Sequence, residues 1–131
     1  MEKEKQDIIE RRNYLVDKFV NATPREVLDH LPSSIGEQFQ GEWALYSCSM
    51  FSAALANISR LYPETAQDNL CYIQRLIDTV MSPELRAYDT NRWGEDALET
   101  LHGSKSHISY ISHLAWMICG YKSVGGDDRY D

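Results

Sequence analysis

The chain has 131 residues, 43% of them hydrophobic, and a formal net charge of −7. This length is typical of one domain that buries a core without metal or disulfide cross-links. Phosphate binding requires a basic surface. The sequence offers only the basic pair Arg11-Arg12, and an acidic residue, Glu10, directly precedes it. We therefore expect neither nucleic acid nor an anionic membrane as a partner. The first residues contain no apolar run typical of a signal peptide, so we expect a cytoplasmic protein unless a leader was removed.

The N-terminal third of the sequence predicts two helices. Residues 2–21 repeat apolar side chains at helical spacing. Thr23-Pro24-Arg25-Glu26 then has the composition of a helix start, with a capping threonine, a proline in the first turn and a glutamate three residues after the cap. This second helix is short and ends near Pro32, and the Pro, Ser and Gly content of residues 32–39 predicts a loop.

Two longer helices are predicted in the middle of the chain. The first runs from about residue 41 to 62 and has no charged residue between Trp43 and Ser59. It is dotted with serines and shorter than the ~20 apolar residues of a membrane span, so we expect a helix buried on most sides. Pro63 ends it, and residues 64–81 follow with one apolar stripe and one charged side.

The last third predicts a long connection and one more helix. Ser82-Pro83-Glu84-Leu85 predicts at most one helical turn, and residues up to about 104 predict a connection with a further turn at 95–101. The last helix spans about 105–124 and stops at Gly125-Gly126. Its apolar residues extend beyond one stripe, so we expect burial on most sides here too.

These elements predict an all-α fold of four or five helices in antiparallel hairpins, because no segment shows the alternation of a strand. We expect a single domain of residues 1–131, with N-terminal helices in 1–31, a three-helix core in 40–124 and a tail at 125–131.

The cysteines and histidines do not predict a metal or cofactor site. Cys48, Cys71 and Cys119 all occur in apolar helical contexts and form no Cys-x-x-Cys pair, so we expect buried, reduced thiols. His107 and His113 are six residues apart, which directs them to different sides of a helix. No glycine-rich phosphate loop is present. We expect no metal and no cofactor.

Residues 107–131 resemble part of the α/α-toroid proteins, which include six-hairpin glycosidases, uronyl epimerases and terpene hydratase-like enzymes. The resemblance lies in a helix ending at Tyr121 and in the following turn, Gly126-Asp127-Asp128-Arg129-Tyr130. It implies that the helices form part of an α/α toroid and that the complete proteins act on carbohydrates or terpenoids. A closed toroid needs more helices than this chain supplies, so either a missing remainder or self-association would complete the core.

The segment from residue 89 to 96 has the composition of a functional site, because it combines carboxylates, a guanidinium and a flat aromatic ring on a predicted loop. The start of the last helix adds a histidine and a tyrosine. The candidate catalytic residues are Asp89, Glu95, Asp96 and His107, and the candidate ligand-binding residues are Arg92, Trp93 and Tyr110. The structural alternative is that Arg92 pairs with a neighbouring acid while Trp93 anchors the loop.

Three functions remain open. The first, which we prefer because no catalytic constellation is recognisable, is a helical interaction or scaffold domain that self-associates to cover its apolar helices. The second is part of a carbohydrate-active α/α-toroid enzyme that binds a sugar near residues 89–110. The third is a small acidic inhibitor or immunity-type protein that covers a basic site on its partner.

Overall fold

The computed structural model describes residues 2–100 and 105–131, which are all-α and contain no β-strand. The helices are α1 (Glu2–Leu15), α2 (Pro24–Asp29), α3 (Glu37–Leu61), α4 (Ala66–Val80), α5 (Pro83–Trp93) and α6 (Ile108–Ser123). A π-helical turn, Val16–Val20, extends α1, and short 3-10 turns lie at Ser33–Ile35 and Pro63–Thr65. No helix in these residues is long and apolar enough to cross a membrane.

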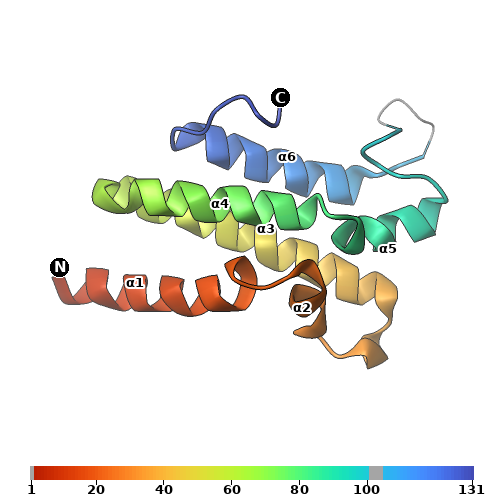
Figure 1. The fold of residues 1–131 in the computed structure, drawn as a ribbon, viewed down its shortest axis with the longest axis horizontal. Helices are drawn as coiled ribbons and strands as arrows, with labels where there is room; N and C mark the ends of the chain where they lie inside the picture. Colours follow the sequence, from red (N-terminus) through yellow and green to blue (C-terminus); the bar gives the residue numbers. More distant parts are fainter. Residues whose placement is uncertain (1, 101–104) are drawn as a thin grey trace.

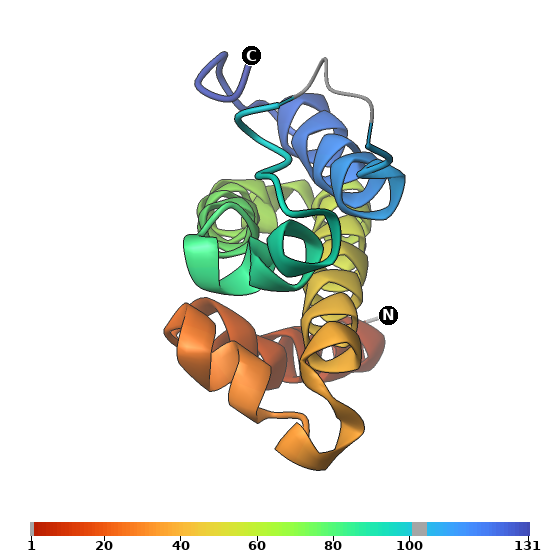
Figure 2. The ribbon, with the colours of Figure 1, turned by 90° about the vertical axis from the view of Figure 1, so that its right-hand side faces the viewer.

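The helices form three layers (Figures 1 and 2). Helices α3 and α4 make an antiparallel hairpin, and α5 continues this middle layer beside the first turns of α3. Helix α6 covers one side of the middle layer, while α1 and α2 cover the other. Helix α3 therefore lies at the centre of the fold and contacts α4, α5 and α6.

The core forms where the apolar stripes of these helices meet. Leu45 and Leu55 of α3, Ile73 of α4 and Tyr110 of α6 have no solvent exposure. Each fully buried large apolar side chain contributes about 1.5–3 kcal/mol to stability before the entropy of folding is subtracted. The predicted apolar stripe of residues 64–81 packs into this core through Leu70, Ile73, Ile77 and Val80.

A buried polar network attaches α1 to the hairpin. The side chain of Asn69 in α4 is fully buried, and its Oδ1 accepts a hydrogen bond from Arg12 Nη1 at 3.0 Å. The Asn69 amide donates to Ser59 Oγ and Thr65 Oγ1, both at 3.0 Å. Buried polar atoms need such partners, so this network fixes how α1 lies against α3 and α4.

The predicted start of α2 is confirmed. Thr23 accepts a hydrogen bond from the backbone of Glu26, and the Glu26 side chain accepts one from the backbone of Thr23. Pro24 occupies the first helical position. This reciprocal capping satisfies backbone donors that the first turn leaves unpaired.

The predicted long connection after Ser82 is wrong, because α5 occupies Pro83–Trp93. Ser82 Oγ accepts a hydrogen bond from the backbone of Leu85, Pro83 is in the first turn, and Gly94 ends the helix at φ +71°. These are the ordinary start and stop signals of a helix. The polar composition of the stretch concealed them. A turn does follow at residues 97–99; the remainder of the predicted turn, residue 101, lies outside the described residues.

The expected burial of the last helix on most sides is also wrong for the isolated chain. Ile108 is 74% exposed and Trp116 is 50% exposed, and Ser112, Ala115 and Cys119 are exposed on the same side of α6. Of the three cysteines, only Cys48 is buried, whereas Cys71 and Cys119 are exposed. The sequence showed apolar residues around α6, but within residues 2–100 and 105–131 other helices pack against only one side of it.

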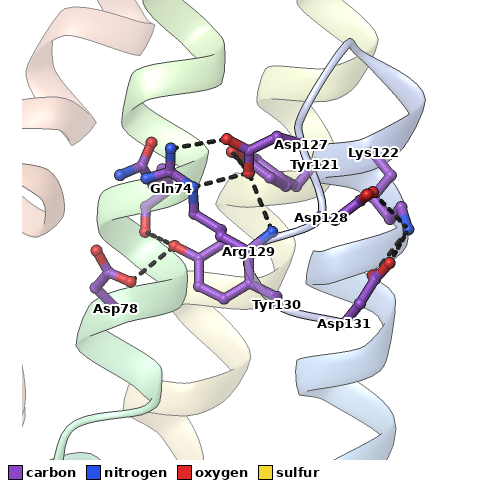
Figure 3. A network of polar contacts seen from close by, with 9 residues as sticks. All are labelled: Gln74, Asp78, Tyr121, Lys122, Asp127, Asp128, Arg129, Tyr130 and Asp131. Carbon is purple, nitrogen blue, oxygen red and sulfur yellow. Dashed lines mark hydrogen bonds and ion pairs between the residues drawn. The ribbon is translucent and has the colours of Figure 1, made fainter.

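The turn that carries the toroid resemblance binds back onto α4 (Figure 3). Asp127 accepts hydrogen bonds from the backbone and Nε of Arg129, and Tyr121 donates to it at 3.2 Å. The Tyr130 hydroxyl lies 2.7 Å from Asp78 Oδ1, and its ring meets that of Tyr121 edge-on at 5.3 Å. The turn thus packs the tail against the end of α6 and the side of α4.

Candidate functional site

The imidazole of His107 is held between two carboxylates. Its Nδ1 lies 2.5 Å from Asp89 Oδ2, and its Nε2 lies 3.0 Å from Glu95 Oε1. Asp89 projects from α5, Glu95 follows the end of α5, and His107 directly precedes α6. The histidine and aspartate side chains are 6% and 5% exposed. The contacts fix the start of α6 to the end of α5.

The two carboxylates determine the protonation of His107. Burial alone would lower the pKa of this imidazole, but hydrogen bonds to Glu95 and Asp89, together with their negative charges, outweigh burial and raise its pKa above 6.5. When the ring is protonated, it donates through both nitrogens, one to each carboxylate. Neither nitrogen is available as a general base while both contacts persist, and the ring fills the space between the carboxylates where a glycosidase places its substrate.

Two predicted site residues lie apart from this arrangement. Asp96 accepts a bidentate hydrogen bond from Arg86, with the shortest contact at 2.7 Å, and also caps the turn that follows through the backbone of Leu98. The hydroxyl of the fully buried Tyr110 donates to the carbonyl of Val80 at 2.7 Å. Both residues therefore have structural partners.

Asp89 also lines a pocket, together with the predicted residues Arg92 and Trp93. Among the described residues no acid forms an ion pair with Arg92, which the structural alternative had expected. The Arg92 guanidinium lies 5.3 Å from the centroid of the Trp93 ring. Trp93 also meets the His107 ring edge-on at 6.3 Å. The three residues lie on α5, not on a loop. The rest of the lining comes from α3 (Gln38 and Glu42), from α5 (Tyr88), and from α6 and the residues before it (Ser106, Ile108 and Ser109).

Tyr88 is the residue of this pocket that sequence reasoning missed. It is 4% exposed, and its hydroxyl has no partner at ordinary hydrogen-bond geometry among the described residues. Burial raises the pKa of this phenol, and the nearby Ser109 hydroxyl offsets only part of the effect. Tyr88 packs so closely on α3 that a β-carbon at Gly41 would lie 2.6 Å from its Cβ. A predicted helix at 83–93 would have placed Tyr88, Asp89 and Arg92 near one another.

A second surface of interest extends over α3 and α6. Trp43 meets Tyr46 edge-on at 5.8 Å, Tyr46 lies 4.8 Å from the His113 ring, and His113 lies 6.3 Å from Trp116. Phe39 and Met50 continue the same stripe of α3 at helical spacing. We call these six residues, Phe39, Trp43, Tyr46, Met50, His113 and Trp116, the α3–α6 face.

The α3–α6 face is apolar and open to solvent. Phe39, Trp43, Met50 and Trp116 are each between 50% and 63% exposed. In Figure 2, α3 lies at the edge of the middle layer below α6, and none of the described helices covers its outer side. An exposed, contiguous apolar surface of this kind marks an interaction site more often than chance.

Comparisons with known proteins give no identification. No protein family, curated protein or solved structure shows a significant match to the chain. The fold is therefore described as all-α.

Proposed function

We propose that the chain is a helical interaction domain that binds a second copy of itself through the α3–α6 face. The observation that carries this proposal is the continuous row of four rings from Trp43 through Tyr46 and His113 to Trp116, which joins two helices into one exposed apolar surface. Burying such a surface is the main favourable term in protein association.

The charge distribution favours a second copy as the occupant. A chain with a net charge of −7 repels its own copies, except where charge is absent from the contact. Helix α3 has no charged residue between Trp43 and Ser59, and α6 has none before Lys122. Burial lowers the pKa of His113, so the face is uncharged at neutral pH. Two such faces complement each other in a two-fold dimer.

The exposed area is consistent with the centre of such a contact. A large aromatic side chain carries about 150–250 Å² of surface. Phe39, Trp43 and Trp116, each about half exposed, therefore present roughly 300 Å² together. A standard interface buries about 800 Å² per partner, so polar residues around the face would supply its rim.

The acidic inhibitor alternative has less support. Acidic residues occur in α1 to α5, in the segment after α5 and in the tail after α6. Several pair with cations of the same chain, as Asp96 does with Arg86 and Asp29 with Arg25. A surface that covers a basic site would concentrate unpaired carboxylates on one side. No observation favours one side of the described residues in this way.

The test is the mass of the protein in solution. Size-exclusion chromatography with light scattering should give twice the chain mass of 15.1 kDa at micromolar concentrations. Met50→Glu and Trp116→Glu should each give the single-chain mass, because burying an unpaired carboxylate in an apolar contact weakens association at least about a hundredfold.

Tyr14→Glu is the matched control. Tyr14 lies on α1, away from the α3–α6 face, and is 63% exposed, as Met50 is. This variant should keep the wild-type mass. A wild-type protein that is monomeric at about 100 μM, far above the micromolar range of a specific dimer, would disprove the proposal. So would equal dimerisation by Met50→Glu and the wild type.

A further inference from the structure

We propose that the pocket between α3, α5 and the start of α6 binds a small neutral molecule that carries several hydroxyl groups. The pocket is lined in part by Gln38, Glu42, Tyr88, Asp89, Trp93 and Ser109. This role is separate from dimerisation through the α3–α6 face.

The first argument is the unsatisfied hydroxyl of Tyr88. A buried phenol without a hydrogen-bond partner destabilises the folded chain, and native proteins keep few such groups. Tyr88 is 96% shielded from solvent and lines the pocket. A ligand hydroxyl can donate a hydrogen bond to the phenol oxygen and accept one from the phenol O–H. The hydroxyl of Tyr88 then has a partner when the pocket is filled.

The second argument is the balance of charge around the pocket. Of the residues that line the pocket, Glu42 and Asp89 carry negative charges and Arg92 carries a positive charge. The sum is one negative charge, so an anionic ligand is repelled. A cationic ligand would lie close to the guanidinium of Arg92. A neutral ligand avoids both penalties.

The third argument is the mixture of donors and acceptors. Gln38 and Glu42 are hydrogen-bonded to each other at 2.6 Å and present an amide and a carboxylate, while Ser106 and Ser109 present hydroxyls. Ligand hydroxyls match such a lining because each one both donates and accepts. Trp93 adds a half-buried apolar wall for the C–H groups of the same ligand.

The volume limits the size of the ligand. The pocket measures about 160 Å³. Sites for drug-sized ligands usually occupy about 300–1,000 Å³. The pocket is therefore suited to a single polyhydroxylated ring, either a free sugar or cyclitol or the terminal ring of a glycan.

The test uses the full chain and its three tryptophans as reporters. Nitrogen–proton NMR spectra resolve the indole N–H signals of Trp43, Trp93 and Trp116, of which only Trp93 lines the pocket. The neutral probes are D-glucose, myo-inositol and cellobiose. D-Glucuronate tests the charge argument, and cyclohexanol offers a ring of similar size with one hydroxyl.

We expect a neutral hydroxylated probe to shift the Trp93 signal with a millimolar Kd and to leave the Trp43 and Trp116 signals unchanged. D-Glucuronate and cyclohexanol should bind at least about tenfold more weakly. Stronger binding of cellobiose than of glucose supports a glycan end as the source, and the reverse order supports a free sugar or cyclitol.

Tyr88→Phe and Tyr110→Phe are matched variants. Tyr88→Phe should weaken binding about tenfold while leaving the melting temperature unchanged or higher, because it removes an unpaired hydroxyl. Tyr110→Phe should lower the melting temperature and leave binding unchanged, because its hydroxyl bonds to Val80 outside the pocket. The proposal is overturned if no hydroxylated probe at roughly 50 mM, well above a millimolar Kd, shifts Trp93. It is also overturned if Tyr88→Phe binds as the wild type does. Neither result bears on the dimer, which is measured by mass.

Discussion

Replacing His107 with leucine should be among the most damaging single substitutions in the chain. Leucine keeps an apolar body at the position but removes both ring nitrogens. Asp89, whose side chain is 5% exposed, then loses its hydrogen-bonding partner and the neighbouring positive charge. Glu95 loses the same partner but is 25% exposed, so water can replace the contact.

The expected loss follows from this difference in burial. Removing one member of a buried ion pair costs about 3–5 kcal/mol, because a charge remains buried without compensation. Total stabilities are usually about 5–15 kcal/mol, so His107→Leu should lower the melting temperature by ten degrees or more, on the order of 3–4 °C per kcal/mol. Glu95→Gln should cost about 1 kcal/mol, the typical contribution of one partly exposed hydrogen bond.

Urea unfolding followed by circular dichroism at pH 6 measures these losses. The double variant Asp89→Asn/His107→Leu should be destabilised by less than the sum of its two single variants, because the second substitution removes the charge that the first leaves unpaired. A His107→Leu loss below about 1 kcal/mol, or equal losses for His107→Leu and Glu95→Gln, would refute the reasoning.

Three further predictions follow from the same structure. The stability that His107 contributes should be complete below pH 6.5 and should decline as the pH rises through the raised pKa of the folded state. Urea unfolding between pH 5 and 9 should therefore show that the difference in unfolding free energy between the wild type and His107→Leu shrinks as the pH rises. A difference that stays constant with pH would contradict this prediction. Gly41→Ala should cost about 1–3 kcal/mol by thermal unfolding, because the new β-carbon would overlap Tyr88. Asn69→Leu should cost roughly 2–3 kcal/mol in the same assay, because it leaves Arg12 without its buried acceptor, and a neutral result would show that water replaces the contact.

The sequence predicted the parts of the fold that local chemistry determines. The helices at α1, α2, α3, α4 and α6 all follow from periodicity and from start and stop residues such as Thr23 and Pro63. The boundaries differ by a few residues, with α3 beginning at Glu37 instead of about residue 41. Helix α5 was missed because its buried residues are few, so polar composition outweighed the capping signal of Ser82.

The candidate site was only partly accessible to sequence reasoning. Composition alone selected Asp89, Arg92 and Trp93, which line one pocket in the structure, and it selected Asp89, Glu95 and His107 without showing that the two carboxylates hold the imidazole between them. That Asp96 pairs with Arg86, and that Tyr110 bonds to Val80, depends on how α5 and α6 approach the hairpin. No spacing within one helix contains that information.

The amino-acid order by itself determined which segments are helical, since capping, proline and apolar periodicity act within a few residues of one another. It did not determine which apolar side of a helix meets another helix. Helices α3 and α6 carry apolar residues around most of their circumference, and only the packing of α4 and α5 left Trp43, Met50 and Trp116 in solvent. Burial depends on neighbours that are distant in the chain. The same is true of the two hydrogen bonds that hold His107 between Asp89 and Glu95, and of the unpaired hydroxyl of Tyr88.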